Sequence, residues 1–365
     1  MKRATVGPRP LHVTLASLDS AKPAVALGPP EGISPFSARI LDQLSLTSWL
    51  PAALVVANAY LVAGMYQVAE ADAAPTLDNL VGAIQILNDK PVGVLIAAIA
   101  GVVLVALVTQ SLEFAAIRFL EGYWGGSTLA ALPWWAGTRV QRLRLALLDR
   151  RAGKLERRAF HSAESRIKRE LRAQPEVATA VLRVGRGEPT AHLDRERVKA
   201  ARAYYEKRTW MRWATADVRN RANSLYIRRA AYPGVPSRLL PTRLGNALRS
   251  AEEHLPGDVS GPKMRGYLYE HLDSIGPTLM HQHNQYRNRL DMYAVMTLLS
   301  VILAALNALL LPEVLPTPAV IAAVTGLLTL SYFSYRGAVA AALDYGPIVV
   351  AIGHSIHRTR TPSSR

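Results

Sequence analysis

The chain has 365 residues, half of them apolar, and its 43 Lys and Arg against 27 Asp and Glu give a formal net charge of +16. Its mean hydropathy is nevertheless positive, which excludes an ordinary soluble basic protein and requires apolar and basic residues to be segregated. Residues 111–290 hold 33 basic and 17 acidic residues, whereas the rest holds 10 of each. The chain has no cysteine, so disulfides, thiolate metal sites and a cysteine nucleophile are excluded.

The first 45 residues predict a mobile tail. They begin with a basic MKR, but no apolar run of about 7 to 15 residues follows, so they do not resemble a cleavable signal peptide. Pro, Gly, Ala and Ser dominate up to residue 38, a composition that is typical of segments without a packed core.

Four long windows without any charged residue follow in the chain. Each has at least 21 residues, and about 20 apolar residues in a helix cross the hydrocarbon layer of a bilayer. Buried helices of a large soluble core would have to produce four such windows by accident. The sequence therefore predicts four transmembrane helices. Their expected bounds are 49–69, 92–109, 293–311 and 319–335.

The connections between the spans predict two hairpins, at 46–112 and 291–335. The segment LPEVLPTP between spans three and four is too short for more than a turn, and LDNLVGAIQIL between spans one and two fits a short amphipathic helix. Residues 336–365 are expected to be a cytoplasmic helix and tail. The predicted fold class is an all-α membrane protein with four transmembrane helices, arranged as two hairpins with a helical cytoplasmic domain between them.

The orientation follows from the basic residues near the span ends, because Lys and Arg are retained on the cytoplasmic side. The two expected outer loops contain only Lys90, whereas Arg39, Arg118, Arg287 and Arg336 lie near the opposite ends. We therefore expect a multi-pass protein of the cytoplasmic membrane, with both termini and the basic region in the cytoplasm.

Small residues predict how the transmembrane helices associate, because close backbone approach replaces hydrophobic burial in lipid. Gly93, Ala97 and Gly101 form a stripe with four-residue spacing. This stripe could pack within the bundle or form a homo-oligomer, and the sequence does not choose between them. Asn58 and Asn307 at mid-span could line a pathway or hydrogen-bond neighbouring helices.

Residues 113–137 predict an interfacial segment, because Trp124, Trp134 and Trp135 lie just after the second span and Trp favours the headgroup layer. The alternative is that these rings belong to the core of the domain that follows.

Residues 138–290 predict a basic helical cytoplasmic domain. Helices are expected at 138–174, at 195–231 and over TRLGNALRSAEEH, where Pro241 would occupy the first turn, and the chain should be helical again from Lys263 with a kink at Pro277. The apolar stripes are thin and rich in Ala. The helices therefore need one another, a second subunit or the membrane surface to be stable.

A candidate interaction surface lies in the second of these helices, where aromatic and basic residues alternate. Such a composition suits nucleic acid or an anionic bilayer, and tethered basic segments gain about 1 kcal/mol per cation near anionic lipid. We expect anionic lipid or a protein partner, and we favour nucleic acid less. The alternative is that the aromatic rings pack on a neighbouring helix. The candidate residues are Lys207, Arg208, Trp210, Arg212 and Trp213, together with Arg243 and Arg249 farther on.

No motif in the sequence indicates catalysis or a cofactor. There is no phosphate-binding loop, dinucleotide fingerprint, zinc-protease helix or calcium loop, and His281 and His283 are two apart where paired metal ligands on a helix are four apart. An enzyme would have to use isolated polar residues such as His254, His271 and Glu270. We therefore expect no catalytic residue, no cofactor and no metal site.

Three segments carry a resemblance to a known family: FLEGYW after the second span, LLPTRLGNALRSAEE before the third, and YRGAVAAALDYG after the fourth. With these segments, the chain resembles a family of uncharacterised actinobacterial multi-pass membrane proteins. The resemblance covers about 35 residues and implies paired spans that flank a helical cytoplasmic domain. It implies no activity.

These observations favour a membrane-anchored interaction or scaffold protein, in which the bundle fixes the position and the basic domain binds its partner. The alternative is an oligomeric pore-forming subunit or a subunit of a translocation complex, because small-residue faces and mid-span amides would also serve such an assembly.

Overall fold

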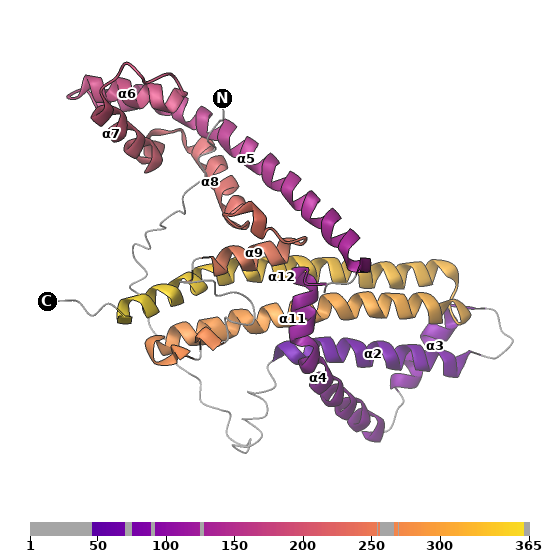
Figure 1. The fold of residues 1–365 in the computed structure, drawn as a ribbon. Helices are drawn as coiled ribbons and strands as arrows, with labels where there is room; N and C mark the ends of the chain where they lie inside the picture. The colour runs from indigo at the N-terminus through magenta and orange to yellow at the C-terminus, as the bar shows by residue number, and fades with distance from the viewer. Residues whose placement is uncertain are drawn as a thin grey trace. The chain divides into compact units, whose positions relative to one another are not determined.

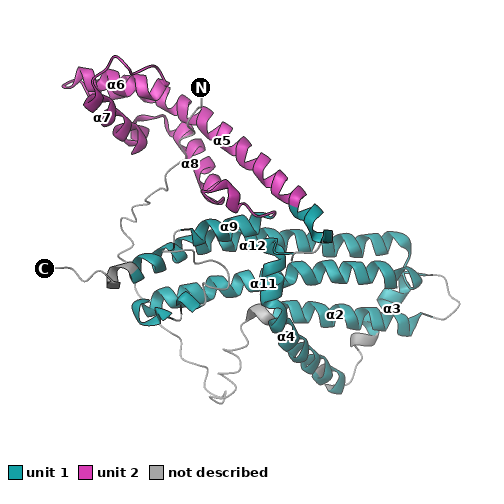
Figure 2. Ribbon diagram, in the orientation of Figure 1, with its two compact units in different colours: residues 1–134, 242–365 teal, residues 135–241 magenta. Residues whose placement is uncertain are grey.

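The computed structural model describes residues 46–69, 75–88, 92–124, 128–253, 255, 266–268 and 270–360. All secondary structure in these ranges is helical (Figure 1). The chain forms two compact units, and unit 2 is inserted into unit 1 along the sequence (Figure 2). Unit 1 comprises residues 1–134 and 242–365, and unit 2 comprises residues 135–241. The tail predicted for residues 1–45 and the last five residues lie outside the described ranges.

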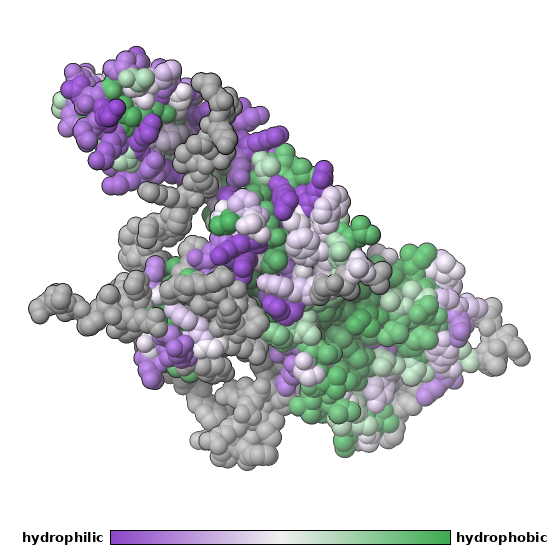
Figure 3. All heavy atoms as spheres, in the orientation of Figure 1, coloured by the Kyte–Doolittle hydropathy of each residue, from purple (hydrophilic) through white to green (hydrophobic). Residues whose placement is uncertain are grey.

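Unit 1 contains four helices that are long and apolar enough to cross a membrane, which confirms that part of the predicted fold class. Apolar residues cover much of its visible surface over these helices (Figure 3). The four stretches are Trp49–Val68, Ile96–Glu121, Pro277–Glu313 and Thr317–Ile356. They lie in α2 (Leu46–Val68), α4 (Val92–Glu121), α11 (Pro277–Leu310) with η4 (Leu311–Glu313), and α12 (Thr317–Arg360). The shorter elements of unit 1 are α3 (Asp78–Asn88), α9 (Arg243–Glu252) and η3 (Leu272–Ser274).

Two helices extend well beyond the predicted spans. α12 continues without interruption through the helix predicted after residue 335, and it accommodates Pro347 in its interior. α11 begins at Pro277, so the kink predicted there is wrong. Proline is favoured at the first helical position, because its missing N–H would have no partner inside the helix.

The predicted interfacial segment 113–137 does not form one element. Its first part continues α4 to Glu121, and its last part lies in α5 (Thr128–Glu170), which enters unit 2. α4 ends at Gly122, whose φ of 98° is the left-handed conformation that glycine adopts at helix ends. Trp124 folds back on this turn, and its indole N–H donates to the Phe119 carbonyl oxygen at 2.7 Å.

The long helices of unit 1 pack around α11, which contacts α12 along its length and also contacts α2 and α4. Small residues allow the close approach of α11 and α12. A Cβ on Gly337 would lie 2.9 Å from the Tyr293 ring. The Ser331 hydroxyl donates to the Thr297 carbonyl oxygen at 3.0 Å, which adds a polar contact between the same two helices.

α3 covers the end of the bundle where α11 turns into α12. The Asn79 amide donates to the Val314 carbonyl oxygen at 2.9 Å, and the Tyr66 hydroxyl donates to the Leu310 carbonyl oxygen at 2.7 Å. Ala83 of α3 is fully buried, and a Cβ on Gly64 of α2 would lie 3.2 Å from its side chain. Asn79 and Ala83 therefore hold the predicted amphipathic helix against the turn and against α2, and Tyr66 joins α2 to the same turn.

The two mid-span amides lie against each other. The Asn58 amide nitrogen donates to the Asn307 side-chain oxygen at 3.2 Å, and the Asn307 amide nitrogen donates back at 2.9 Å.

The small-residue stripe predicted on α4 does not lie in close contact with another helix along its length. A Cβ on Gly93 would meet nothing within 4 Å, Ala97 is exposed, and a Cβ on Gly101 would lie 3.9 Å from Val56 of α2.

Replacing Asn307 by Leu should destabilise unit 1 by about 1 kcal/mol, because an interhelical bond in the bilayer is worth about 0.6 to 1.7 kcal/mol and Asn58 would lose its partner. The double variant Asn58→Leu with Asn307→Leu should be less destabilised than the sum of the single variants. Thermal unfolding of the full-length protein in detergent measures the coupling. Additive effects of the two substitutions would contradict the reciprocal pair.

Unit 2 is a helical layer built on the long helix α5. Its other elements are α6 (Pro175–Arg186), α7 (Arg195–Glu206), η1 (Thr209–Trp213), α8 (Ala216–Ala230) and η2 (Pro236–Arg238). The single helix predicted at 195–231 is therefore wrong. Arg208 has a φ of 53°, outside the helical region, and the chain turns there into the 3₁₀ segment η1. The left-handed conformation at Gly187 ends α6.

An aromatic cluster forms the core of unit 2. Phe160 and Trp210 are fully buried, and their rings meet edge to face with centroids 5.2 Å apart. Tyr205 stacks on Trp210 at 5.6 Å and contacts Phe160 at 5.5 Å. Gly185 of α6 lies directly over Phe160, since a Cβ there would be 2.1 Å from the ring. The helix can approach the ring only because residue 185 has no side chain.

Gly185→Ala should destabilise unit 2 by about 1 to 3 kcal/mol, because the added methyl group overpacks the core against Phe160. Gly153→Ala in α5 is the matched control, since a Cβ there meets nothing within 4 Å, and it should be neutral or slightly stabilising. Thermal unfolding of the full-length protein, followed by tryptophan fluorescence, compares the two. Equal stabilities would contradict this packing.

Candidate functional site

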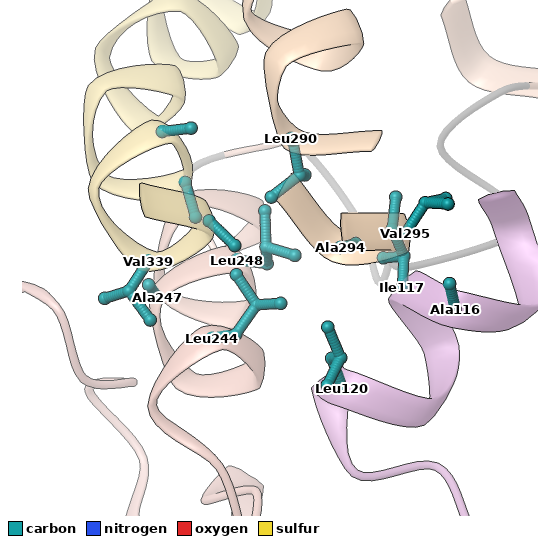
Figure 4. Packing of buried hydrophobic residues seen from close by; sticks show 13 residues of the cluster. Ala116, Ile117, Leu120, Leu244, Ala247, Leu248, Leu290, Ala294, Val295 and Val339 are labelled. Carbon is teal, nitrogen blue, oxygen red and sulfur yellow. The ribbon is translucent and has the colours of Figure 1, made fainter. Parts of the chain in front are cut away.

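The three segments of the family resemblance meet in unit 1 on a single apolar cluster. It joins the end of α4, the length of α9, the middle of α11 and the second half of α12 (Figure 4). α9 presents Leu244, Ala247 and Leu248 to it, each buried. The other buried members are Ala116, Ile117, Leu120, Leu290, Ala294, Val295, Ala338, Val339, Ala341 and Ala342. The chain that returns from unit 2 is therefore packed against three long helices as soon as it enters unit 1.

The start of α9 is fixed by hydrogen bonds to two other helices. Thr242 caps the helix, because its side-chain oxygen accepts from the Gly245 backbone N–H at 3.0 Å. The same hydroxyl donates to the Glu121 carbonyl oxygen of α4 at 3.0 Å. The Tyr335 hydroxyl of α12 accepts from the backbone N–H groups of Arg243 and Leu244 at 3.2 and 3.5 Å. Pro241 lies before this cap, so its predicted place in the first turn is wrong.

Asn246 completes the fixation of α9 from inside. Its side chain is fully buried, and its amide nitrogen donates to the Thr242 carbonyl oxygen at 2.7 Å. Close packing at the other end of α9 comes from Gly346 of α12, where a Cβ would lie 3.6 Å from the Ala251 side chain.

A balanced set of charges lies beside this apolar cluster. Arg118 and Glu121 of α4 are 3.8 Å apart, and Arg249 and Glu252 of α9 are 3.5 Å apart. Arg287 and Asp291 of α11 form a third pair at 3.7 Å. Glu121 and Asp291 are less than one tenth exposed. The Glu121 carboxylate also interacts electrostatically with Glu252, Arg249 and Arg287, so the three pairs form one network, which we call the ionic cluster.

The ionic cluster pairs every charge that it buries, and this is the condition under which buried charges are tolerated. Three carboxylates face three guanidinium groups from three helices, and Arg118 also lies 3.8 Å over the Tyr123 ring. Each ion pair joins two residues of one helix, and the link between the helices is electrostatic: the Glu121 carboxylate of α4 interacts with Glu252 and Arg249 of α9 and with Arg287 of α11.

The polar residues considered for catalysis are dispersed or already bonded to protein groups. His283 is buried and shares a hydrogen bond of 2.9 Å with the Tyr345 hydroxyl of α12. His281 is within 2.9 Å of the Gln285 amide, and the His271 ring nitrogen is within 2.9 Å of the Tyr267 carbonyl oxygen. His254 lies outside the described residues. Among the residues that were described, no group of three His, Asp or Glu side chains could hold a metal ion.

The structure divides the predicted interaction surface between the two units. In unit 2, Lys207 is exposed, whereas Trp210 is buried in the aromatic core and cannot present its ring to a partner. Arg208 lies 3.6 Å over the Tyr226 ring and 3.7 Å from Glu156. Of the two alternatives that the sequence left open, the structure supports packing on a neighbouring helix for Trp210 and not a place on an interaction surface, because the turn at Arg208 directs the ring inward onto α5.

The other predicted residues differ in their exposure. Arg212 pairs with Glu170 and also lies 4.8 Å over the Trp213 ring, which packs at the edge of the core. In unit 1, Arg243 is exposed at the start of α9, and Arg249 is part of the ionic cluster. Lys207, Arg212 and Arg243 are therefore the exposed members of the predicted set.

Sequence reasoning missed Glu121 and Tyr335, which hydrogen-bond the start of α9, and the buried Asp291 of α11, which pairs with Arg287. Two signals could have indicated them. Glu121 and Tyr335 lie within segments of the family resemblance, and Asp291 ends an uncharged window one turn after Arg287. That the three segments pack on one apolar cluster could be seen only from their contacts in the structure.

Comparisons of the chain with protein-family models, curated proteins and solved structures give no match. The class of the protein therefore rests on its own architecture: a helical protein with four helices long and apolar enough to cross a membrane, and a basic helical unit inserted between the second and the third of them.

Tyr335→Phe should destabilise unit 1 by about 1 to 2 kcal/mol, because two backbone N–H groups at the start of α9 would lose their acceptor. Tyr332→Phe, on the same helix but more than half exposed, is the matched control and should have little effect. Thermal unfolding in detergent gives both values. Indistinguishable effects of the two substitutions would show that α9 is held in another way.

Proposed function

We propose that this protein is a membrane-anchored interaction protein, whose bundle fixes its position and whose inserted basic unit binds an acidic protein partner. The observation that carries the proposal is the charge of unit 2. Residues 135–241 hold 26 Lys and Arg against 10 Asp and Glu, so the excess of 16 positive charges equals the net charge of the whole chain. A charge so concentrated on one unit attracts anionic partners and accelerates their association.

The proposed topology places unit 2 and both termini in the cytoplasm, with α2 and α4 as one hairpin and α11 and α12 as the other. Contacts between the helices of each pair support the hairpins. The orientation is supported by the arginines Arg118, Arg287 and Arg289 near the ends of the spans that lead to unit 2.

The exposed cations of unit 2 support partner binding through its surface. Arg202 and Lys207 are exposed at the end of α7. Other residues of unit 2 are held in the fold by ion pairs or by burial. Arg186 hydrogen-bonds Glu164 at 3.0 and 2.6 Å, which lowers the pKa of the Glu164 carboxyl. Burial raises the pKa of the Tyr205 hydroxyl to about 12. The fold therefore leaves cations at the surface, while Phe160, Tyr205 and Trp210 pack in the core.

The alternative of a pore subunit drew on the mid-span amides and the small-residue faces. Asn58 and Asn307 donate to each other, so each amide uses one N–H group and its carbonyl oxygen in a contact between helices. The interaction protein is therefore the function that the described contacts favour.

A photo-crosslinking amino acid at Lys207 or Arg202 should give a covalent adduct with a second protein in intact cells. The same group at Ile321, an exposed apolar residue of α12, should give no such adduct, because the residue faces lipid in the proposed arrangement. Gel mobility and mass spectrometry of the purified full-length protein identify the adducts. Cells without an adduct from any exposed cationic position of unit 2 would contradict the proposal.

The topology is tested separately in the cysteine-free chain. A single cysteine at Lys207 should react with a membrane-impermeant maleimide only after permeabilisation, whereas one at Glu313 should react in intact cells. The reverse pattern would overturn the proposed orientation.

A further inference from the structure

One face of α5 in unit 2 is apolar and exposed. Trp135, Val140, Leu143 and Leu147 are 58%, 45%, 60% and 51% exposed, respectively. At 100° per residue they lie within an arc of about 140°, so they form one continuous stripe about 18 Å long on the helix. We call these four residues the outer stripe.

The opposite face of the same helix segment packs against other residues of unit 2. Gln141 and Leu145 are buried, and the Tyr232 hydroxyl donates to the Gln141 side-chain oxygen at 3.1 Å. A Cβ on Gly137 would lie 2.7 Å from Pro241. The outer stripe is therefore a second, separate apolar face, which the packing of unit 2 does not cover.

Cations border and extend the outer stripe. Arg142 and Arg144 are exposed on its two edges, and Arg139 lies within it, over the Trp135 ring at 5.3 Å. One to two turns farther along, the same angular positions are occupied by Arg150 and Lys154, both exposed. Within the described parts of the chain, Arg142, Arg144, Arg150 and Lys154 make no ion pair.

We propose that the outer stripe of α5 lies in the headgroup layer of an anionic leaflet, with its apolar side chains at the hydrocarbon boundary and its flanking arginines on lipid phosphates. An interfacial helix needs an apolar face with Trp or Leu, bordered by Lys or Arg that reach the phosphates with their long side chains. The outer stripe and its border supply both.

The charges and the chain connection favour lipid over a protein partner for this face. A protein that covered the outer stripe would have to provide carboxylates along both edges, whereas an anionic leaflet provides hydrocarbon and phosphate everywhere at the required depth. Only fourteen positions separate Trp135 from Glu121 at the end of the apolar helix α4, so the chain itself keeps the stripe near the bilayer. The inference rests on the proposed function in one respect: the membrane that anchors the bundle is the membrane to which the outer stripe attaches unit 2.

The test measures the depth of the outer stripe in the full-length protein. Single cysteines replace Leu143 or Leu147 in the cysteine-free chain, carry an environment-sensitive fluorophore, and are studied in nanodiscs of phosphatidylcholine alone or mixed with phosphatidylglycerol. With the anionic lipid, both probes should shift to shorter wavelength and be quenched by brominated acyl chains. A probe at Ile227, an exposed apolar residue of α8, is the matched control and should remain open to aqueous iodide.

Charge removal tests the role of the border. Arg142→Gln, Arg144→Gln and Arg150→Gln should each lower the ratio of docked to undocked probe by about fivefold, because a cation near anionic lipid contributes about 1 kcal/mol. Thermal unfolding of each variant verifies that unit 2 remains folded; a variant that unfolds is replaced by the corresponding Arg→Ala substitution.

Two outcomes overturn the inference. Iodide could quench the probes at 143 and 147 as strongly as the control in both lipid mixtures, which would place the outer stripe in water. Alternatively, the probes could be shielded from iodide but insensitive to brominated lipid, which would mean that protein covers the stripe. The depth of the outer stripe does not depend on which side of the membrane unit 2 occupies. The maleimide result can therefore contradict the proposed function while the depth measurement supports this inference. The maleimide result can equally support the proposed function while the depth measurement contradicts this inference.

Discussion

The docking of α9 on the long helices is the interaction on which the rest of unit 1 depends. α9 begins at Thr242, directly after the inserted unit ends, and that residue hydrogen-bonds both its own helix and the Glu121 carbonyl oxygen of α4. Tyr335 satisfies two N–H groups at the start of the same helix. Because a helix start leaves N–H groups without intrahelical partners, these contacts select one position for α9. The apolar cluster and the ionic cluster then form around it.

Unit 1 has different kinds of contact in its apolar spans and at the ends of these spans. In the apolar spans, helices meet through small residues and the reciprocal amide pair, because lipid competes for apolar surface and leaves close contact and hydrogen bonds as the source of specificity. At the ends of the spans, α4, α9 and α11 each carry an acid–arginine pair, and Glu121 of α4 also interacts electrostatically with charged residues of α9 and α11. Removing the arginine partner of the buried Glu121 or Asp291 would leave a buried charge with less compensation.

Unit 2 differs from unit 1 in that its core is an aromatic cluster and much of its surface is cationic. Phe160, Tyr205 and Trp210 form the core, and Gly185 permits the approach of α6. In the proposed arrangement, exposed basic residues such as Arg202 and Lys207 meet an acidic partner, and the outer stripe of α5 is a separate face for lipid. A basic unit with both faces can be held at a membrane surface and still present charge to a protein.

The sequence by itself determined the four helices long and apolar enough to cross a membrane, the short amphipathic helix over LDNLVGAIQIL and the helix within TRLGNALRSAEEH, because uninterrupted apolar length and local helix periodicity are properties of contiguous residues. It did not determine that the 195–231 helix breaks at Arg208, that Trp210 is buried, or that Glu121 and Tyr335 hydrogen-bond the start of α9. Only the tertiary structure decided these features. They depend on contacts between distant residues, such as Thr242 and Glu121, which are 121 positions apart. Neither composition nor periodicity records which distant residues become neighbours.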